Sequence, residues 1–151
     1  MFNCLRGFEI VDNCKNGLGT AIKIPTRATK GSIGYDFYSP VSTVINPKSS
    51  IMIWTDIKSY FPDDEALIIT VRSSMGKNNI MLANTIGVID SSYYNNEENE
   101  GNIGINLYNY GDVPYEIKLG DRIAQGFFVR CAIGADKPKD VRRGGFGSTN
   151  K

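Results

Sequence analysis

The sequence predicts an all-β fold, a sandwich or barrel of short strands with at most one short helix. Short runs rich in β-branched and aromatic residues recur along the chain, and turn signals made of Gly, Pro, Asn and Asp separate them about every ten residues. In addition, no segment keeps the roughly 3.6-residue period of an amphipathic helix over three turns. The pattern is typical of a protein built from antiparallel strands.

The predicted elements follow one another along the chain. Residues 34–38, Gly-Tyr-Asp-Phe-Tyr, are predicted to form a strand with one inward carboxylate. Residues 51–57 and 66–71 are further β-rich runs, and the one short helix fits near 74–79. In residues 103–107, Ile and Leu alternate with Gly and Asn, which is the pattern of a half-buried strand.

The chain is expected to form one domain, residues 1–134, followed by a C-terminal arm, residues 135–151. A length of 151 residues suits a single domain with a sizeable core, and a hydrophobic fraction of 41% argues against wholesale disorder. The last stretch is rich in Lys, Pro and Gly, which favours an arm that leaves the domain.

The composition disfavours several classes of function. Lys and Arg total 17 against 16 for Asp and Glu, so no direct nucleic-acid binding is expected. No membrane association is expected either, since no apolar run approaches the length of a membrane span. The three cysteines are an odd number without a C-x-x-C pair, which fits a reducing compartment. We therefore expect an intracellular, cytoplasmic protein, in the host cell if the source is viral.

The absence of histidine narrows the chemistry further. Histidine is the commonest general base and the commonest zinc ligand, so proton transfer here must use a carboxylate, Lys, Tyr or Cys. Asp90 ends the apolar run Gly-Val-Ile-Asp and precedes an aromatic residue. It is therefore a leading general-base candidate, and a turn-capping Asp is the structural alternative.

Five polar, Gly-rich segments lie against the predicted strands: residues 34–38, 71–76, 87–93, 120–125 and 143–149. The second offers hydroxyls and backbone N–H groups at a helix start, which suit an anion. In the last, glycines allow close backbone approach, Ser, Thr and Arg can bind phosphate, and Phe offers a flat face for a base. Each segment alone also has a plain explanation as a strand, a turn, a helix cap or a mobile tail.

The order and spacing of the segments together are specific. Gly-Val-Ile-Asp followed by Tyr, then Gly-Asp-Arg-Ile-Ala-Gln, then Gly-Gly-Phe-Gly-Ser-Thr resemble motifs of the trimeric dUTP pyrophosphatase family, from Gly34 to Thr149. The resemblance implies a distorted jelly-roll-like β-barrel and a homotrimer in which every active site borrows residues from all three chains. It also implies hydrolysis of dUTP to dUMP and pyrophosphate, which limits uracil in DNA and supplies dUMP for dTMP synthesis.

The resemblance implies roles for individual residues. Asp90 matches the carboxylate that activates the water attacking the α-phosphorus, and Arg143 the arginine that reaches the γ-phosphate. Asp36 matches an acid that supports the site near the phosphates and metal. The residues expected to bind the substrate are Arg72, Ser73, Ser74, Asn84, Gly87, Ile89, Tyr93, Gln125, Phe146, Gly147, Ser148 and Thr149.

Within that set, the resemblance assigns each part of the nucleotide. Ser73 and Gln125 match phosphate contacts, and Tyr93 matches the aromatic beneath the deoxyribose, where it leaves no room for a 2′-hydroxyl. The hairpin at 84–89 is expected to read the uracil edge, and Phe146 to lie over the base. Mg²⁺ is the expected cofactor, held mainly by triphosphate oxygens and water without a direct protein ligand.

Departures from the family pattern leave questions open. Arg142 and Arg143 both precede Gly144 without the usual spacer, so either can be the phosphate-contacting arginine, and Arg143 is preferred. Residues 95–100 form an insertion rich in Asn and Glu for which the sequence offers no account. The arm that follows Gln125 is short, so which subunit supplies it is open.

Two other functions are considered. A dCTP deaminase shares the fold, but the hairpin with Tyr93 and the Gly-Phe-Gly-Ser-Thr tail favour pyrophosphate release. A nucleotide-binding regulatory or structural protein without turnover is disfavoured because Asp90, Gln125 and an arginine are retained. Ammonia release from dCTP would reveal the first alternative.

Overall fold

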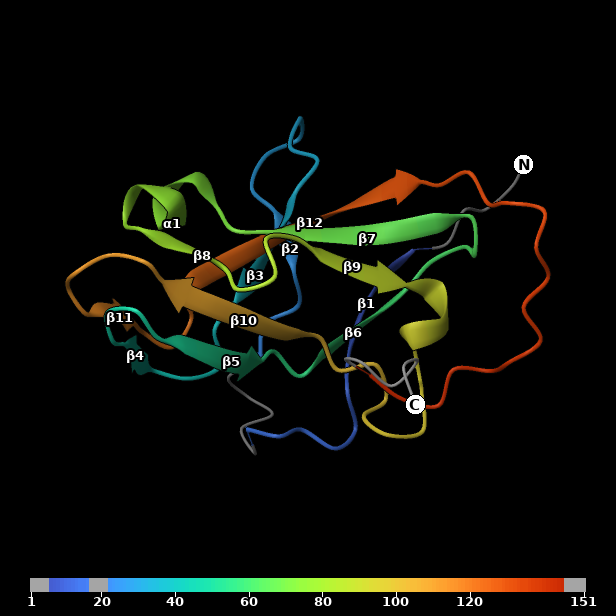
Figure 1. The fold of residues 1–151 in the computed structure, drawn as a ribbon, viewed down its shortest axis with the longest axis horizontal. Helices are drawn as coiled ribbons and strands as arrows, with labels where there is room; N and C mark the ends of the chain where they lie inside the picture. The colour runs from blue at the N-terminus through green and yellow to red at the C-terminus, as the bar shows by residue number, and fades with distance from the viewer. Residues whose placement is uncertain (1–5, 17–21, 146–151) are drawn as a thin grey trace.

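The part of the chain that the structure describes is all-β with one short α-helix, as predicted. The structure, a computed structural model, describes residues 6–16 and 22–145. The helix α1 spans Ser73–Lys77, and a 3₁₀ helix, η1, spans Ser91–Tyr93. The strands, drawn in Figure 1, are β1 Gly7–Ile10, β2 Thr26–Arg27, β3 Tyr35–Tyr38, β4 Thr43–Ile45, β5 Ser50–Trp54, β6 Ile57–Tyr60, β7 Glu65–Thr70, β8 Ile80–Leu82, β9 Gly87–Asp90, β10 Gly104–Asn109, β11 Tyr115–Ile117 and β12 Arg122–Arg130.

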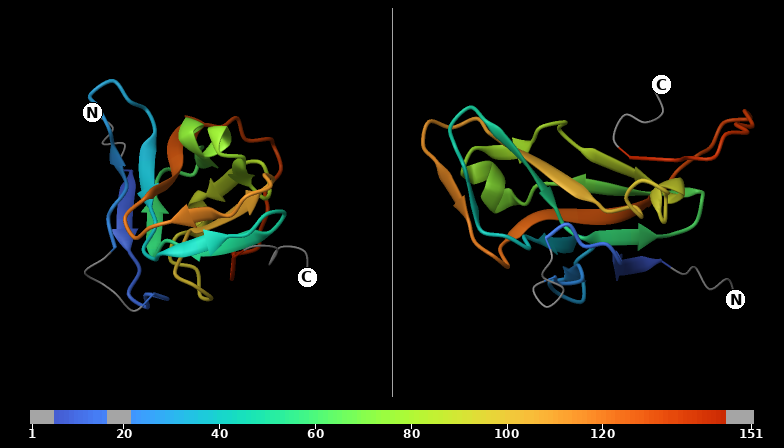
Figure 2. Two further views of the ribbon diagram at one scale, coloured as in Figure 1. Left: turned by 90° about the vertical axis from the view of Figure 1, so that its left-hand side faces the viewer. Right: turned by 90° about the horizontal axis from the view of Figure 1, so that it is seen from below.

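Antiparallel sheets enclose a common core. Within the described ranges, a five-stranded sheet has the order β2-β3-β12-β7-β9 and a three-stranded sheet the order β5-β10-β8. The pairs β1-β6 and β11-β4 complete the wall. The two turned views show strands on opposite sides of the core (Figure 2). The predicted jelly-roll-like barrel is therefore confirmed.

Apolar side chains fill the space between the sheets. β10 buries every second residue, including Ile105 and Leu107, as the alternating pattern predicts. Burial of each such side chain stabilises the fold by about 1.5–3 kcal/mol. Gly126 lets β12 approach this core closely, because a Cβ there would stand 2.9 Å from both Ile69 Cδ1 and Phe37 Cε2.

The predicted helix is confirmed close to its expected place, whereas one predicted β-run is interrupted. Residues 51–57 do not form one continuous strand, because β5 and β6 are separated at Thr55 and Asp56. Asp56 has a φ of 57°, in the left-handed region where a strand cannot continue. Asp is among the few non-glycine residues that adopt this region readily.

The carboxylate of Asp56 ties the N-terminal segment to the barrel. Its side chain is fully buried and its Oδ1 accepts hydrogen bonds from Lys15 N (2.9 Å) and Asn102 Nδ2 (2.8 Å). Its Oδ2 accepts from Asn16 N (3.0 Å) and Asn16 Nδ2 (2.8 Å). A buried carboxylate is tolerated only when its oxygens are satisfied in this way.

Residues 131–145 follow the last strand without regular structure and are mostly exposed. They run past one end of the barrel towards the loop that follows η1 (Figure 1). The division into residues 1–134 and 135–151 stays a prediction. Cys14 and Cys131 are free, and no described helix is long and apolar enough to cross a membrane.

We expect Asp56→Asn to destabilise the protein by about 2–4 kcal/mol, because an amide group would face N–H donors that the carboxylate now satisfies. Urea unfolding at one fixed protein concentration measures the change. The control is Asp112→Asn, which removes an exposed ion pair with Lys48 and should cost less than about 1 kcal/mol. Equal effects of the two substitutions would contradict the anchoring role of Asp56.

Candidate active site

Asp90 lies at the end of β9, where the strand passes into η1. Its backbone is extended, with φ −85° and ψ 154°, and its side chain is 60% exposed. The next residue, Ser91, donates a hydrogen bond from Oγ to Asp63 Oδ1 at 2.7 Å, which holds the start of η1. A carboxylate in this position is accessible to water, as a general base requires.

Tyr93, three residues further on, is buried beside this strand end, with only 3% of its surface exposed. Its hydroxyl donates to the Asn102 carbonyl at 2.6 Å and accepts from Asn99 Nδ2 at 2.8 Å. Burial raises the pKa of Tyr93, although the hydrogen bond from Asn99 and the nearby Arg142 act in the opposite direction. The phenol therefore stays neutral near pH 7 and presents a fixed aromatic surface.

Arg142 of the arm covers this pair. Its NH1 lies 2.7 Å from Asp90 Oδ2, and its guanidinium carbon lies 5.2 Å from the centroid of the Tyr93 ring. Its Nε donates to the Gly144 carbonyl at 2.9 Å. Arg143, in contrast, is exposed. A cavity of about 50 Å³ remains between these groups, lined by Val88, Ile89, Asp90, Tyr93 and Arg142.

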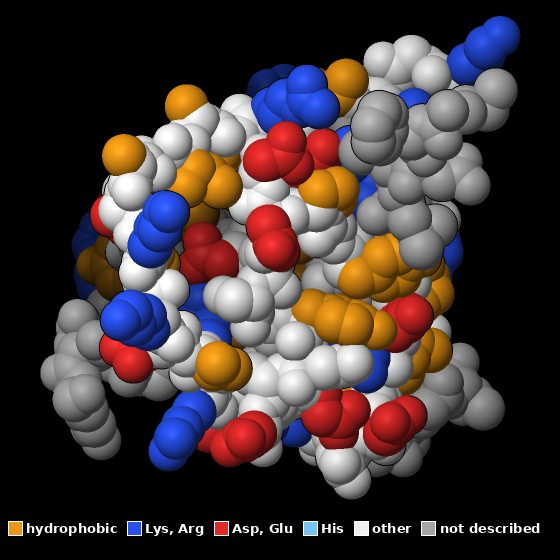
Figure 3. Space-filling model, turned by 90° about the vertical axis from the view of Figure 1, so that its right-hand side faces the viewer, with side chains coloured by type: hydrophobic (Ala, Val, Ile, Leu, Met, Phe, Trp, Pro, Cys, Tyr) orange, Lys and Arg blue, Asp and Glu red, His pale blue; other side chains and the backbone are white. Residues whose placement is uncertain are grey.

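The inserted loop contacts the arm at the same end of the molecule. The Gly145 N–H donates to Glu98 Oε2 at 3.0 Å. A Cβ on Gly144 would stand 2.1 Å from the same oxygen, so only glycine fits there without a shift of the carboxylate. On this face, acidic, basic and apolar side chains are interspersed (Figure 3).

Asp36 organises a second group of polar residues. It is buried in β3, with Oδ1 2.9 Å from Arg72 Nε and Oδ2 3.4 Å from Arg122 NH1. Gln125 lies opposite Asp36 in the β3–β12 register, and its Nε2 donates to the Val71 carbonyl at 3.4 Å. Two guanidinium groups thus share one carboxylate, which leaves a net positive charge suited to an anion.

Ser73 and Ser74 open α1 beside this group. Both are exposed, and Arg72 at the N-cap position forms no side-chain cap. The hydroxyls and the helix start therefore face solvent next to two arginines. An adjoining cavity of about 240 Å³ is lined by Arg72, Met75, Tyr115, Ile117, Asp121, Arg122 and Ile123.

Asn84 lies in the exposed turn between β8 and β9. Thr85 in this turn has a φ of 67°, and its N–H donates to the Leu82 carbonyl at 3.0 Å. Gly87 is half-buried and Ile89 buried. Because β9 is an edge strand of its sheet, its outer backbone groups have no strand partner among the described residues and can read the edge of a base.

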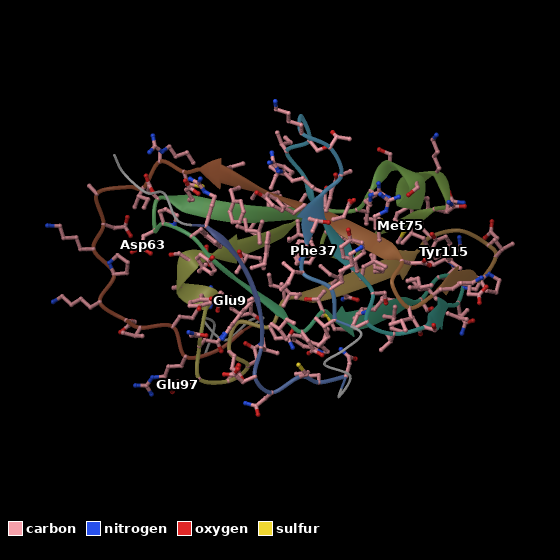
Figure 4. The ribbon with its side chains drawn as sticks, turned by 180° about the vertical axis from the view of Figure 1, so that it is seen from behind. Glu9, Phe37, Asp63, Met75, Glu97 and Tyr115 are labelled. Carbon is pink, nitrogen blue, oxygen red and sulfur yellow. The ribbon has the colours of Figure 1, made fainter. Side chains whose placement is uncertain are left out.

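The two groups of predicted site residues lie at opposite ends of β7. Asp90 pairs with Ala66 near one end, and Gln125 pairs with Thr70 at the other. Four residues of strand span about 13 Å, and Arg72 lies further on. Figure 4 shows the same separation: Met75 of α1 lies at one end, and Asp63 and Glu97 lie at the other.

Comparison with known proteins decides the family of this chain. The dUTPase family profile matches residues 20–150. The chain belongs to the dUTPase family. It is 38% identical over 149 residues to the deoxyuridine 5′-triphosphate nucleotidohydrolase of Lactococcus lactis, covering 96% of this chain and 97% of the relative. The crystal structure of the dUTPase from Streptococcus mutans matches with a TM-score of 0.77 at 30% identity, covering 86% of this chain and 99% of that one.

A mutant dUTPase from phage phi11 of S. aureus shares the fold, with a TM-score of 0.71 at 21% identity and coverage of 89% of this chain and 95% of that one. That protein coordinates a structural Mg(II) ion. In the described part of the present dUTPase-family chain, no group of three or more Cys, Asp or Glu side chains could hold a metal ion. Both oxygens of Asp36 already face arginines.

The structure thus gathers the predicted residues of this dUTPase-family chain into two sets. Asp90, Tyr93 and Ile89 form one, and Arg72, Asp36 and Gln125 belong to the other, with Ser73 and Ser74. Phe146, Gly147, Ser148 and Thr149 lie outside the described residues.

Sequence reasoning assigned no role to three contacts of the site. Arg122 pairs with Asp36. Its position in the Gly-Asp-Arg-Ile-Ala-Gln motif could have indicated a role in the site. Glu98 contacts the arm and Asn99 contacts Tyr93. Both lie in the insertion, where composition alone predicted only a polar loop.

Proposed function

We propose that the chain hydrolyses dUTP to dUMP and pyrophosphate, and thereby limits uracil in DNA and supplies dUMP for dTMP synthesis. The observation that carries this proposal is the placement of Asp90, an exposed carboxylate beside the buried ring of Tyr93 and in contact with Arg142. Membership of the dUTPase family and the name of the Lactococcus lactis relative support it.

In the proposed step, Asp90 acts on a water molecule. Its carboxylate takes a proton from the water while the water oxygen forms a bond to the α-phosphorus. The bond from that phosphorus to the bridging oxygen breaks, and its electron pair leaves with pyrophosphate. A positioned base of this kind accelerates a reaction by roughly 10²–10⁴.

Selectivity would come from Tyr93 and β9. The neutral Tyr93 ring would lie beneath the deoxyribose and leave no space for a 2′-hydroxyl. The outer edge of β9 and the turn at Asn84 would pair with the uracil edge, since edge-strand backbone groups provide donors and acceptors at fixed spacing. A close backbone fit of this kind would also exclude the methyl group of thymine.

We further propose a homotrimer with shared active sites. A triphosphate is shorter than the separation along β7, so Asp90 and Ser73 of one chain would not reach the same triphosphate. Ser73, Arg72 and Gln125 of one subunit would instead hold the phosphates beside Asp90 of another. Exposed apolar side chains such as Val88, at 55%, are suited to a subunit contact.

Mg²⁺ is proposed as the cofactor. The described residues form no carboxylate cage, which suits an ion bound chiefly through substrate phosphates and water. When bound, it would neutralise triphosphate charge and align the leaving pyrophosphate. The arginines beside Asp36 would share in offsetting that charge.

The function is tested by measuring pyrophosphate release from dUTP, dCTP, dTTP and UTP in parallel, with Mg²⁺ or with EDTA. We expect release from dUTP that depends on Mg²⁺ and little from the others. Ammonia is assayed with dCTP, and its release would indicate deamination instead. If no nucleotide is cleaved, the proposal is wrong, and nucleotide binding without turnover is the alternative to test next.

Asp90→Asn should lower kcat for dUTP by roughly 10²–10⁴ because the amide cannot accept the proton. Binding of dUTP, measured by calorimetry, should persist because the other contacts are unchanged. Asp64→Asn, an exposed position paired with Arg130, is the control and should keep normal turnover. Near-normal turnover of Asp90→Asn would contradict the general-base assignment.

The substitutions Arg142→Ala and Arg143→Ala distinguish the roles of the two arginines. The contacts with Asp90 and Tyr93 favour Arg142, and we expect its loss to lower kcat/KM for dUTP by about 10²–10³, as for a group that stabilises transition-state charge. Arg143→Ala should cost less than about tenfold. A larger loss with Arg143→Ala would support the assignment that the sequence favoured.

A further inference from the structure

The inserted loop, residues 95–100, is closed by its own asparagines. Asn96 is buried, and its Nδ2 donates to the Tyr93 carbonyl and to Asn99 Oδ1, both at 2.8 Å. Its Oδ1 accepts from the N–H groups of Glu98 and Asn99, both at 3.1 Å. The loop thus folds back onto the residue that ends η1.

The orientation of the Asn99 amide follows from its neighbours. Its Oδ1 accepts from Asn96 Nδ2 at 2.8 Å and from the Gly101 N–H at 3.1 Å. Two donors at one end require the oxygen there, so the amide nitrogen must be the end that faces Tyr93. The hydrogen bond from Asn99 Nδ2 to the Tyr93 hydroxyl, at 2.8 Å, therefore has one direction.

The direction of this hydrogen bond in turn determines where the hydroxyl hydrogen of Tyr93 points. Because Asn99 donates to the phenol oxygen, the hydroxyl hydrogen is directed to the Asn102 carbonyl, 2.6 Å away. The Tyr93 ring is held at its far end by these contacts while Arg142 lies over its face. A tilt of the ring that displaces its hydroxyl would break both hydrogen bonds.

The loop does not depend on this bond for its own closure. The Glu100 carboxylate accepts from the N–H groups of Asp12 (2.8 Å) and Asn13 (3.1 Å), and Lys58 Nζ donates to Asn95 Oδ1 at 2.7 Å. Asn96 closes the interior of the loop. The Asn99 Nδ2 group is thus the part of the loop directed at the phenol.

We propose that Asn99 is a positioning residue that fixes the Tyr93 ring and thereby sets the discrimination between deoxyribose and ribose nucleotides. The proposal rests on the proposed dUTP hydrolysis and on the proposed place of Tyr93 beneath the deoxyribose, whereas the contact between Asn99 and Tyr93 does not. Asn99 would not touch the substrate. A ring held closely against the sugar excludes a 2′-hydroxyl, whereas a ring free to tilt makes room for it.

The sharpest variant is Asn99→Asp. It keeps an oxygen towards Asn96 and Gly101 and replaces the amide donor with a second acceptor. The Tyr93 hydroxyl can then donate either to the new carboxylate or to the Asn102 carbonyl, so one of its two present hydrogen bonds is lost. We expect kcat/KM for dUTP relative to UTP to fall about tenfold, the usual effect of one hydrogen bond. The control is Asn95→Asp, which adds the same charge to the same loop and keeps an acceptor for Lys58, and the ratio should stay within about twofold.

A double-mutant cycle adds a second readout. Tyr93→Phe keeps the ring and removes the hydroxyl, so Asn99→Asp should have little further effect on the dUTP/UTP ratio in that background. Additive effects of the two substitutions would overturn the proposal. Equal losses for dUTP and UTP in Asn99→Asp would also overturn it, because they would indicate general damage to the fold.

Failure of the proposed function is distinguishable from failure of this inference. If the unmodified protein does not hydrolyse dUTP, the same cycle is measured by urea unfolding, which needs no substrate. A shift in midpoint that is smaller for the pair of substitutions than the sum of the single shifts would support the contact. Independent, additive shifts would show that Asn99 does not hold Tyr93.

Discussion

The length of β7 is the constraint on which the organisation of the site depends. The strand is paired on both sides, with β12 and with β9, so no local movement can shorten it. It places the phosphate-binding candidates beyond Thr70 and the candidate base opposite Ala66. Under the proposed function, a single chain would carry two incomplete halves of a site. Assembly of several chains is a geometric requirement of the proposed chemistry, in addition to any gain in stability from burying apolar surface.

The carboxylates of the two halves, Asp36 and Asp90, lie in different environments. Asp36 is buried between Arg72 and Arg122, where removal of the carboxylate would leave both arginines without their shared partner. It acts as a fixed support that orients both guanidinium groups. Asp90 is exposed, and a solvent-exposed ion pair such as that with Arg142 contributes only about 0–1 kcal/mol. Arg142 can therefore exchange Asp90 for a phosphate at little cost, which would leave the carboxylate available to a water molecule.

Local patterns predicted the features that depend on local periodicity. The alternation in β10, the short helix and the inward Asp36 all follow from side-chain spacing. The break at Asp56 was missed because β-rich residues flank it on both sides, whereas the groups that satisfy its buried carboxylate lie far away in sequence, such as Asn102. The same limit applies to Arg122, whose partner Asp36 is joined to it by strand pairing and not by sequence proximity.

The candidate base was predictable for a different reason. A carboxylate at the end of an apolar strand, in a chain without histidine, can be recognised from the sequence alone. The division of the site between two ends of β7 could not be predicted from the sequence, because strand lengths and pairing partners were needed to locate each motif. The placement of Arg142 over Tyr93 likewise depends on the path of the arm, which the adjacent arginines leave open.

The inserted loop, although polar, has a defined backbone conformation and a defined set of hydrogen bonds. Its ends, Asn95 and Glu100, adopt left-handed φ values of 54° and 60°, which turn the chain back on itself. Asparagine suits this loop twice, since it tolerates such a backbone and since its amide has distinct donor and acceptor ends. A carboxylate at position 99 would still accept the loop's donors, but it would compete with the Asn102 carbonyl for the single hydrogen of the Tyr93 hydroxyl. The oxygen of the Asn99 amide thus closes the loop, and its nitrogen is the end that contacts Tyr93, which is the contact on which the proposed positioning role depends.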